Sequence, residues 1–161
     1  MKQQEPAHIK QQLQDVPDGS LTIVRNAAVG QEDVLLASQF SAKTVGKGKI
    51  EVYHVFHGVD ASYNLLLAPE VTVHHDVLPS VLELFYCRNG RVGWNMRGGT
   101  AVYLGAGDLT VHSAACCADS AMMFPLGYAE GISVSIDLPV LAATCPEILK
   151  ESRLDLSAIQ N

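Results

Sequence analysis

Short runs of β-branched and aromatic residues follow one another through the middle of the chain, from Ile50 to Asp137. Turn residues such as HGVD, APE, NG, RGG and GAG separate these runs. Such a pattern predicts eight or nine strands, and their close spacing leaves no room for βαβ crossovers. We therefore predict a mainly β fold, an antiparallel β-barrel or jelly roll. The predicted strands are IEVYHVF, SYNLLLA, VTVHH, SVLELFYC, RVGWNM, TAVYL, DLTVHS, AMMF and GISVSID.

The two ends of the chain lack this alternation. Residues 1–18 are rich in glutamine and predict a frayed arm or short helix that contributes little to a core. The segment QEDVLLASQF, residues 31–40, has acids in its first turn and predicts a short helix. The last part predicts one or two short helices, interrupted at Pro146. The expected organisation is an arm and short helix over 1–49, a barrel over 50–138 and a helical segment over 139–161.

Two pairs of turn residues predict the register in the middle of the sheet. Asn89-Gly90 is typical of a two-residue hairpin, because a type I′ turn needs positive φ at both central residues. That hairpin would pair Arg88 with Arg91. Gly98-Gly99 would make a second hairpin of the same kind, in which the residues on either side of the turn again face each other. Three consecutive strands are then in register.

In this register Phe85, Trp94 and Tyr103 form a cross-strand aromatic row on the face that we expect to line the barrel. Glu83 lies on the same face. A buried carboxylate is costly unless it is paired, protonated or bound to a ligand, so Glu83 is the best candidate for a binding residue. A register slip by one residue, or a position of Glu83 at the rim in water, is the alternative. Trp94 is either a core residue or a stacking surface for a ring-shaped ligand.

Composition and charge exclude several classes of function. The 161 residues are 48% hydrophobic and carry a formal net charge of -6, and no segment gathers the basic residues that phosphate binding needs. We expect no DNA binding by this chain alone. The four cysteines make no CxxC pair, which is typical of a reducing compartment. No run of 18 apolar residues occurs. We therefore expect a soluble, cytoplasmic protein that does not enter a membrane.

Several segments resemble a known family. ELFYCRNG fits the E(x)6G half of the first cupin motif, and YLGAGDL resembles the turn that opens the second, so the predicted mainly β, antiparallel jelly-roll barrel looks like a cupin. LELFYCRNGRVGW, YLGAGDLTV and FPLGYAEGISVSID, with VFHGVDASYN before them, look like the N-terminal sensor domain of AraC-family transcription regulators. The resemblance covers roughly residues 50–140.

The resemblance implies an effector-sensing and dimerisation domain that is not an enzyme and needs no cofactor. Its partners would be a small-molecule effector and a second copy of the chain. DNA would be bound only through a C-terminal helix-turn-helix domain that is absent from this chain, so we expect the chain to be part of a longer regulator. The ligand-binding candidates are Glu83, Phe85, Trp94, Tyr103 and His112. The dimerisation candidates implied by the resemblance are Leu138, Leu141, Ile148, Leu149 and Leu154.

The chain departs from the metal-binding cupins. Those proteins need a His-x-His pair shortly before the glutamate and a further histidine in the second motif, whereas His74, His75 and His112 are out of register here. We therefore expect no metal centre, because several convergent ligands are needed to hold the ion. His112 is instead expected to line the floor of the pocket. The alternatives are a stand-alone small-molecule-binding cupin and a metal-dependent cupin enzyme.

Overall fold

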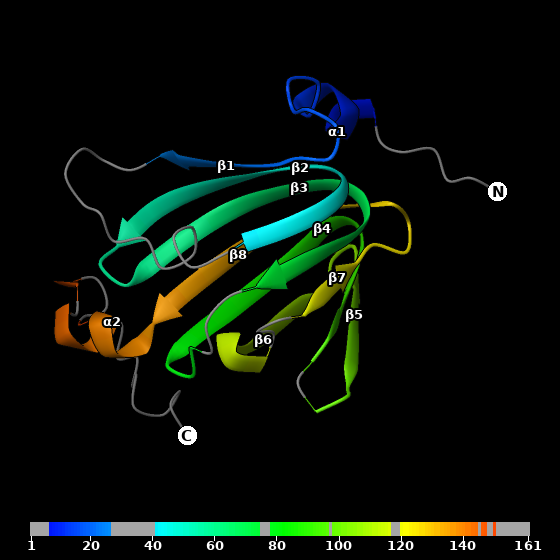
Figure 1. The fold of residues 1–161 in the computed structure, drawn as a ribbon. Helices are drawn as coiled ribbons and strands as arrows, with labels where there is room; N and C mark the ends of the chain where they lie inside the picture. Colours follow the sequence, from blue (N-terminus) through cyan, green and yellow to red (C-terminus); the bar gives the residue numbers. More distant parts are fainter. Residues whose placement is uncertain are drawn as a thin grey trace.

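Eight strands and short helices make up the described chain in the computed structural model (Figure 1). The structure describes residues 7–26, 41–74, 78–96, 98–116, 120–144, 146–147 and 150. The helix predicted over 31–40 lies outside these residues. The elements are α1 (Ala7–Gln12), β1 (Leu21–Asn26), β2 (Ser41–Phe56), β3 (Val59–His74), β4 (Val81–Asn95), β5 (Ala101–Gly105), β6 (Leu109–Ser113), η1 (Ala114–Cys116), β7 (Ala121–Met123), β8 (Tyr128–Asp137) and α2 (Leu138–Thr144).

Long strands shared between two sheets close the barrel. The first half of β3 pairs with β8 and its second half with β7. β4 also pairs with β8 first and then with β7, so β3, β8, β4 and β7 form a closed ring. The first sheet has the order β1, β2, β3, β8, β4, β6, and β2, β3, β7, β4 and β5 make the second. The predicted mainly β, cupin-like antiparallel barrel is confirmed.

The sheet begins earlier in the chain than predicted. β1 runs parallel to β2, with Leu21 beside Gly48, and β2 itself starts at Ser41. Both elements fall in the segment assigned to the N-terminal arm, so the boundary at residue 50 is wrong. The first part of β2 was not predicted as a strand, because its glycines and lysines have low β-propensity.

The predicted hairpin at Asn89-Gly90 is wrong, because β4 continues through it. Asn89 faces Glu130 and Gly90 faces Ala129 on β8, and the register shifts between Cys87 and Asn89, as at a β-bulge. Gly90 has a φ of 84°. The positive φ that makes Asn-Gly suitable for a tight turn also suits a bulge, where one strand carries an extra residue and bends.

The register predicted at Gly98-Gly99 is shifted by one residue. Met96 rather than residue 97 closes the loop with Thr100, through an N–H to O hydrogen bond of 2.8 Å. Trp94 therefore faces Val102, and Tyr103 faces Gly93. A one-residue shift moves every side chain of a strand to the other face of the sheet.

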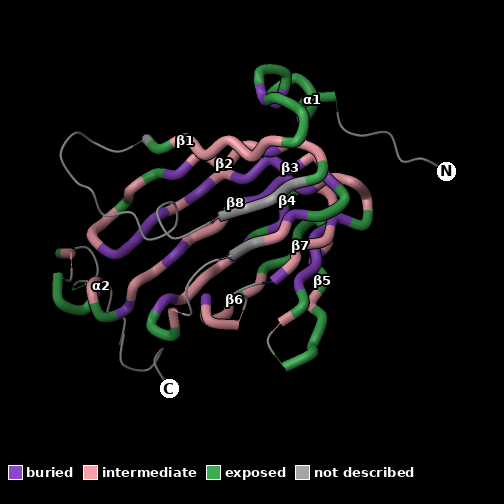
Figure 2. Tube along the Cα trace, viewed as in Figure 1, coloured by how far each residue is buried: buried purple, intermediate pink, exposed green. Residues whose placement is uncertain are grey.

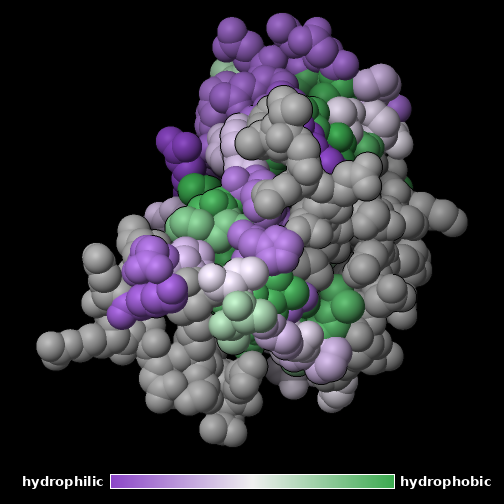
Figure 3. Space-filling view, turned by 90° about the vertical axis from the view of Figure 1, so that its left-hand side faces the viewer, coloured by the Kyte–Doolittle hydropathy of each residue, from purple (hydrophilic) through white to green (hydrophobic). Residues whose placement is uncertain are grey.

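The N-terminal helix is part of a core, contrary to the prediction for residues 1–18. Ile9 and Leu13 are fully buried and pack with Val16 on Leu65, on the outer face of the first sheet. The other side of α1 is polar, and hydrophilic side chains cover the top of the molecule, where α1 lies (Figure 3). A polar composition thus conceals an amphipathic helix.

The main core fills the inside of the barrel. Buried residues follow β3, β4 and β8 (Figure 2), and Phe85, Val92, Trp94 and Phe124 belong to one cluster. α2 begins directly after β8, where the Asp137 carboxylate accepts a hydrogen bond from the Val140 N–H at 3.1 Å. Such a cap satisfies an amide that otherwise has no partner within the helix.

The role of α1 can be tested with Ile9→Ala. Removing a fully buried side chain leaves a cavity and costs about 2–5 kcal/mol of unfolding free energy. Gln11→Ala, on the exposed side of α1, is the control and should change stability by less than about 0.5 kcal/mol. Urea unfolding measures both. Equal stability of the two variants would show that α1 is not part of the core.

Candidate functional site

A row of five polar residues crosses the inner face of the first sheet. Residues that face one another across neighbouring strands form it, one from each of β6, β4, β8, β3 and β2. The row lies near the end of the barrel where β8 ends and α2 begins. Because these strands come from distant parts of the sequence, only the folded sheet brings the five side chains together. In order across the sheet they are His112, Glu83, Ser135, Asp60 and His54.

Each carboxylate of this inner polar row has an imidazole beside it. Nε2 of His112 lies 3.4 Å from Oε2 of Glu83, and Nδ1 of His54 lies 3.0 Å from Oδ1 of Asp60. Asp60 is almost completely buried, whereas the Glu83 side chain is 22% exposed. The two pairs flank Ser135 from opposite sides.

Two polar atoms of the row have no hydrogen-bond partner among the described residues. They are Oγ of Ser135, whose residue is 1% exposed, and Nδ1 of His112. An unsatisfied buried polar atom costs free energy, and such atoms are uncommon in folded proteins. A bound molecule that hydrogen-bonds to them would remove this cost. In the next rows Ser62, Asn64 and Ser133 hydrogen-bond with one another and so need no ligand.

An aromatic surface adjoins the row. Phe85 and Trp94 are buried and pack edge to face, with ring centroids 5.3 Å apart. The Trp94 ring also lies 6.2 Å from the His112 ring. The inner face thus combines apolar rings with carboxylates, imidazoles and a hydroxyl, which is the composition of many small-molecule sites.

The structure brings four of the five predicted ligand-binding residues to the inner face: Glu83, Phe85, Trp94 and His112. The expected place of Tyr103 in the aromatic row is wrong. Tyr103 is 45% exposed on the outer face, its ring lies over Gly93, and its ring centroid is 5.6 Å from the Arg91 guanidinium carbon. The one-residue register shift in β5 is the physical reason.

Sequence reasoning missed His54, Asp60 and Ser135. Their signal was present: Asp60, Ser62 and Asn64 alternate along one strand, as do Ser133 and Ser135 along another. Alternating polar residues usually mark a solvent-facing side, and only the barrel closure shows that this side faces inward.

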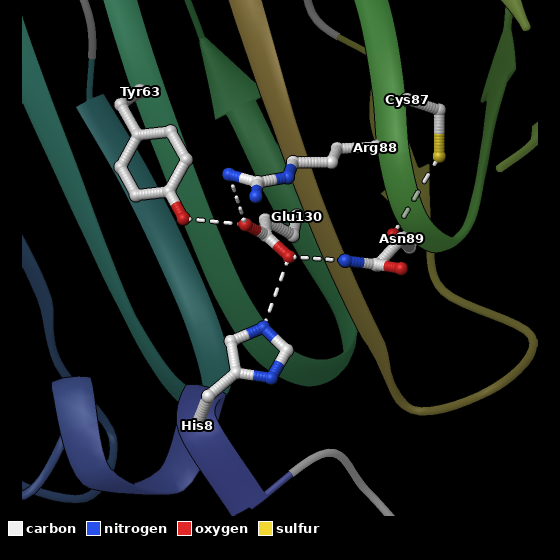
Figure 4. Close-up of polar contacts among 6 residues, drawn as sticks. All are labelled: His8, Tyr63, Cys87, Arg88, Asn89 and Glu130. Atoms are coloured by element: carbon white, nitrogen blue, oxygen red, sulfur yellow. Dashed lines mark hydrogen bonds and ion pairs between the residues drawn. The ribbon is translucent and has the colours of Figure 1, made fainter. Parts of the chain in front are cut away.

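A second polar cluster lies on the outer face beneath α1, around the buried carboxylate of Glu130 (Figure 4). Tyr63 donates a hydrogen bond to it at 2.5 Å and the Asn89 amide donates another at 2.6 Å. Nε2 of His8, on α1, lies 3.0 Å away, and Arg88 approaches within 3.3 Å. The cluster therefore connects α1, β3, β8 and the bulge of β4.

Burial alone would raise the pKa of Glu130, but hydrogen bonds from Tyr63, Asn89 and His8, together with the Arg88 charge, hold that pKa below its ordinary value. Burial and the hydrogen bond to Glu130 raise the pKa of Tyr63 to about 12. Burial also raises the pKa of the nearby Cys87 thiol, which makes it a poor nucleophile.

The remaining predicted residues have mixed outcomes. Leu138 and Leu141 are buried within the chain, and their role in a dimer stays a prediction. Ile148, Leu149 and Leu154 lie outside the described residues, as do His75 and the side chain of His74. Over the described ranges, no three His, Cys, Asp or Glu side chains gather closely enough to hold a metal ion. None of the helices in these ranges is long and apolar enough to cross a membrane.

Comparison with known proteins gives only distant likenesses. No protein-family model and no curated protein matches the sequence. A cupin 2 conserved barrel domain protein from Salinispora arenicola is 12% identical, with a TM-score of 0.48, over 73% of this chain and 98% of that one. A conserved protein with a double-stranded β-helix domain from Klebsiella pneumoniae is 15% identical, with a TM-score of 0.47, over 69% of this chain and 89% of that one.

An HTH_3 family transcriptional regulator from Vibrio cholerae is 12% identical, with a TM-score of 0.43 over 54% of this chain. The chain spans half the length of that regulator. Likenesses at this level leave family and activity to be argued from the chain's own residues.

The Glu130 cluster makes stability depend on pH. A carboxyl group whose pKa is lowered on folding stabilises the fold above its ordinary value of 4.5, and this contribution is lost as the pH falls through the folded-state pKa. Glu130→Gln should therefore be less stable than the wild type at pH 7, and the difference should shrink below about pH 4.5. Urea unfolding across this range measures it, with the exposed Glu70→Gln variant as control. A difference that does not change with pH would contradict the role of the charge.

Proposed function

We propose that the chain is a small-molecule-binding barrel that acts as the effector-sensing and dimerisation domain of an AraC-like regulator. The effector binds at the inner face, against Phe85 and Trp94, and makes polar contacts with Glu83 and His112. The observation that carries this proposal is the pair of unpartnered buried atoms, Ser135 Oγ and His112 Nδ1. The sequence resemblance to the AraC sensor domains supports the regulatory part.

The position of the inner polar row supports a sensing mechanism. Ser135 lies on β8 two residues before Asp137, which caps α2. Asp60 follows the turn at Gly58, and that turn packs closely against Val140 and Leu141 of α2. An effector that contacts the row therefore touches residues that lie next to α2 in the sequence or in the fold. Binding that favours one position of α2 would shift the population of the chain toward that state.

A homodimer is the second part of the proposal, and an apolar outer surface supports it. β6 pairs with β4 alone among the described strands, so its other edge carries no strand in the described part of the chain. Leu109 and Val111 on β6 are more than half exposed, and Tyr86 and Ile132 continue the surface over β4 and β8. A second copy that pairs along β6 would bury these side chains.

The ligand site is tested by Trp94→Ala and Glu83→Gln. Both variants should lose effector binding, and Glu83→Gln should keep the fold, since the change is nearly isosteric. Tyr103→Ala, on the outer face, is the control and should bind normally. A thermal-shift screen of small molecules supplies the ligand, because binding to the folded state raises the unfolding midpoint. Calorimetric titration then compares the variants, and unchanged affinity in both would place the site elsewhere.

The dimer surface is tested by Val111→Asp. A charge in the middle of the apolar surface should convert a dimer into a monomer, because a buried unpaired carboxylate is strongly unfavourable. Val45→Asp changes a valine that is also more than half exposed but lies on β2, and this variant should remain dimeric. Sedimentation equilibrium measures both. A wild-type chain that is monomeric, or a Val111→Asp dimer, would exclude this surface.

A further inference from the structure

The inner polar row contains two carboxylates without a nearby lysine or arginine among the described residues. Every described cationic side chain close to the first sheet is engaged on the outer side of the barrel or exposed. Lys47 pairs with Asp18, Lys49 with Glu51 and Arg88 with Glu130, and Arg91 lies over Tyr103. Among the described residues, no lysine or arginine therefore balances the two carboxylates of the row.

The two carboxylates are evenly placed around the unpartnered hydroxyl. Glu83 on β4 and Asp60 on β3 both face Ser135 on the intervening strand β8. Two strand spacings of about 4.8 Å separate β3 from β4, so the backbones of the two acids lie roughly 10 Å apart. Ser135 lies on the strand between them, and its Oγ has no hydrogen-bond partner in the described part of the chain. A ligand that contacts all three groups must have a polar group at each end.

Each carboxylate keeps the capacity to bind such a group. An ionised carboxylate has two oxygens that accept about four hydrogen bonds, and a single imidazole occupies only part of this capacity. Ammonium groups donate charge-assisted hydrogen bonds to carboxylates, which are stronger than bonds between neutral groups. Carboxylates on the ligand would instead be repelled by Glu83 and Asp60. The adjoining rings of Trp94 and Phe85 suit methylene groups and also attract cations.

We propose that the inner polar row binds a short aliphatic diamine, with one ammonium group on Glu83 and the other on Asp60, and that Ser135 Oγ accepts a further hydrogen bond from one of these ammonium groups. This inference rests on the proposed function and names the ligand class of the same site. The methylene chain crosses the inner face of β8 beside Phe85 and Trp94. His112 and His54 hold the two carboxylates in place and act as positioning residues.

A matched series of four-carbon molecules tests the inference. 1,4-Diaminobutane, 1,4-butanediol and succinate differ only in their end groups, and calorimetric titration at pH 7.5 compares them. The wild type should bind the diamine at least about tenfold more tightly than the diol, since hydrogen bonds to charged groups are the stronger ones. Succinate should not bind.

Variants then assign the end groups. Glu83→Gln and Asp60→Asn should each weaken diamine binding by about tenfold or more. Glu70→Gln, an exposed acid of β3, is the control and should leave it unchanged. If Asp60→Asn fails to fold, Ser135→Ala replaces it. That variant removes a hydroxyl without a partner in the described chain, so it should keep the fold. It should still weaken diamine binding, because a bound ammonium group loses one hydrogen-bond acceptor.

The outcomes separate this inference from the proposed function. The diamine assignment is overturned if the wild type does not bind the diamine. It is also overturned if Glu83→Gln and the second variant, Asp60→Asn or Ser135→Ala, both bind the diamine with wild-type affinity. The diamine assignment is also overturned if the diol or succinate binds as tightly as the diamine. If Trp94→Ala abolishes that binding, the effector site itself is still supported. The proposed function is overturned as well only if the wider screen finds no small molecule whose binding is abolished by Trp94→Ala.

Discussion

The barrel depends on two strands that each belong to both sheets. β3 and β4 pair first with β8 and then with β7, and this ring turns two sheets into one closed structure. A strand that passes between sheets must bend, and in β4 the bend coincides with the bulge at Arg88 and the positive φ of Gly90. The bulge in turn places Arg88 and Asn89 on Glu130, so the buried carboxylate and the bend of the strand stabilise each other.

Fold class was predictable because nine separate β-rich runs all indicated the same architecture, and an error in any one of them changes little. Register was not predictable, because it depended on two glycine-containing turns. Asn89-Gly90 satisfied the rule for a hairpin and served a bulge instead. Met96 closed the second turn one residue earlier than expected, which moved Tyr103 to the outer face. The sequence shows which residues tolerate a positive φ. The pairing of distant strands decides whether such a residue forms a hairpin turn or a bulge.

The candidate site shows the same division. Glu83, Phe85 and Trp94 were predictable because they alternate on strands whose apolar side is clear. His54, Asp60 and Ser135 were not, because polar alternation ordinarily marks the wet side of a sheet. Here the barrel is divided along its length: Leu66, Val92 and Phe124 fill the apolar part, and the imidazole–carboxylate pairs occupy the part next to α2. The division gives one interior both a packed core and a polar surface.

The inner polar row draws one residue from each of five strands, and this has a consequence for how the molecule opens. No hairpin or smaller folding unit contains the whole row, so partly folded forms lack it. A molecule bound across the row would hold β2 and β6 in one cooperative unit through the strands between them, and amides in both strands would then exchange with solvent only when the whole barrel unfolds. A ligand could then bind across the row only in molecules in which all five strands of the sheet are paired.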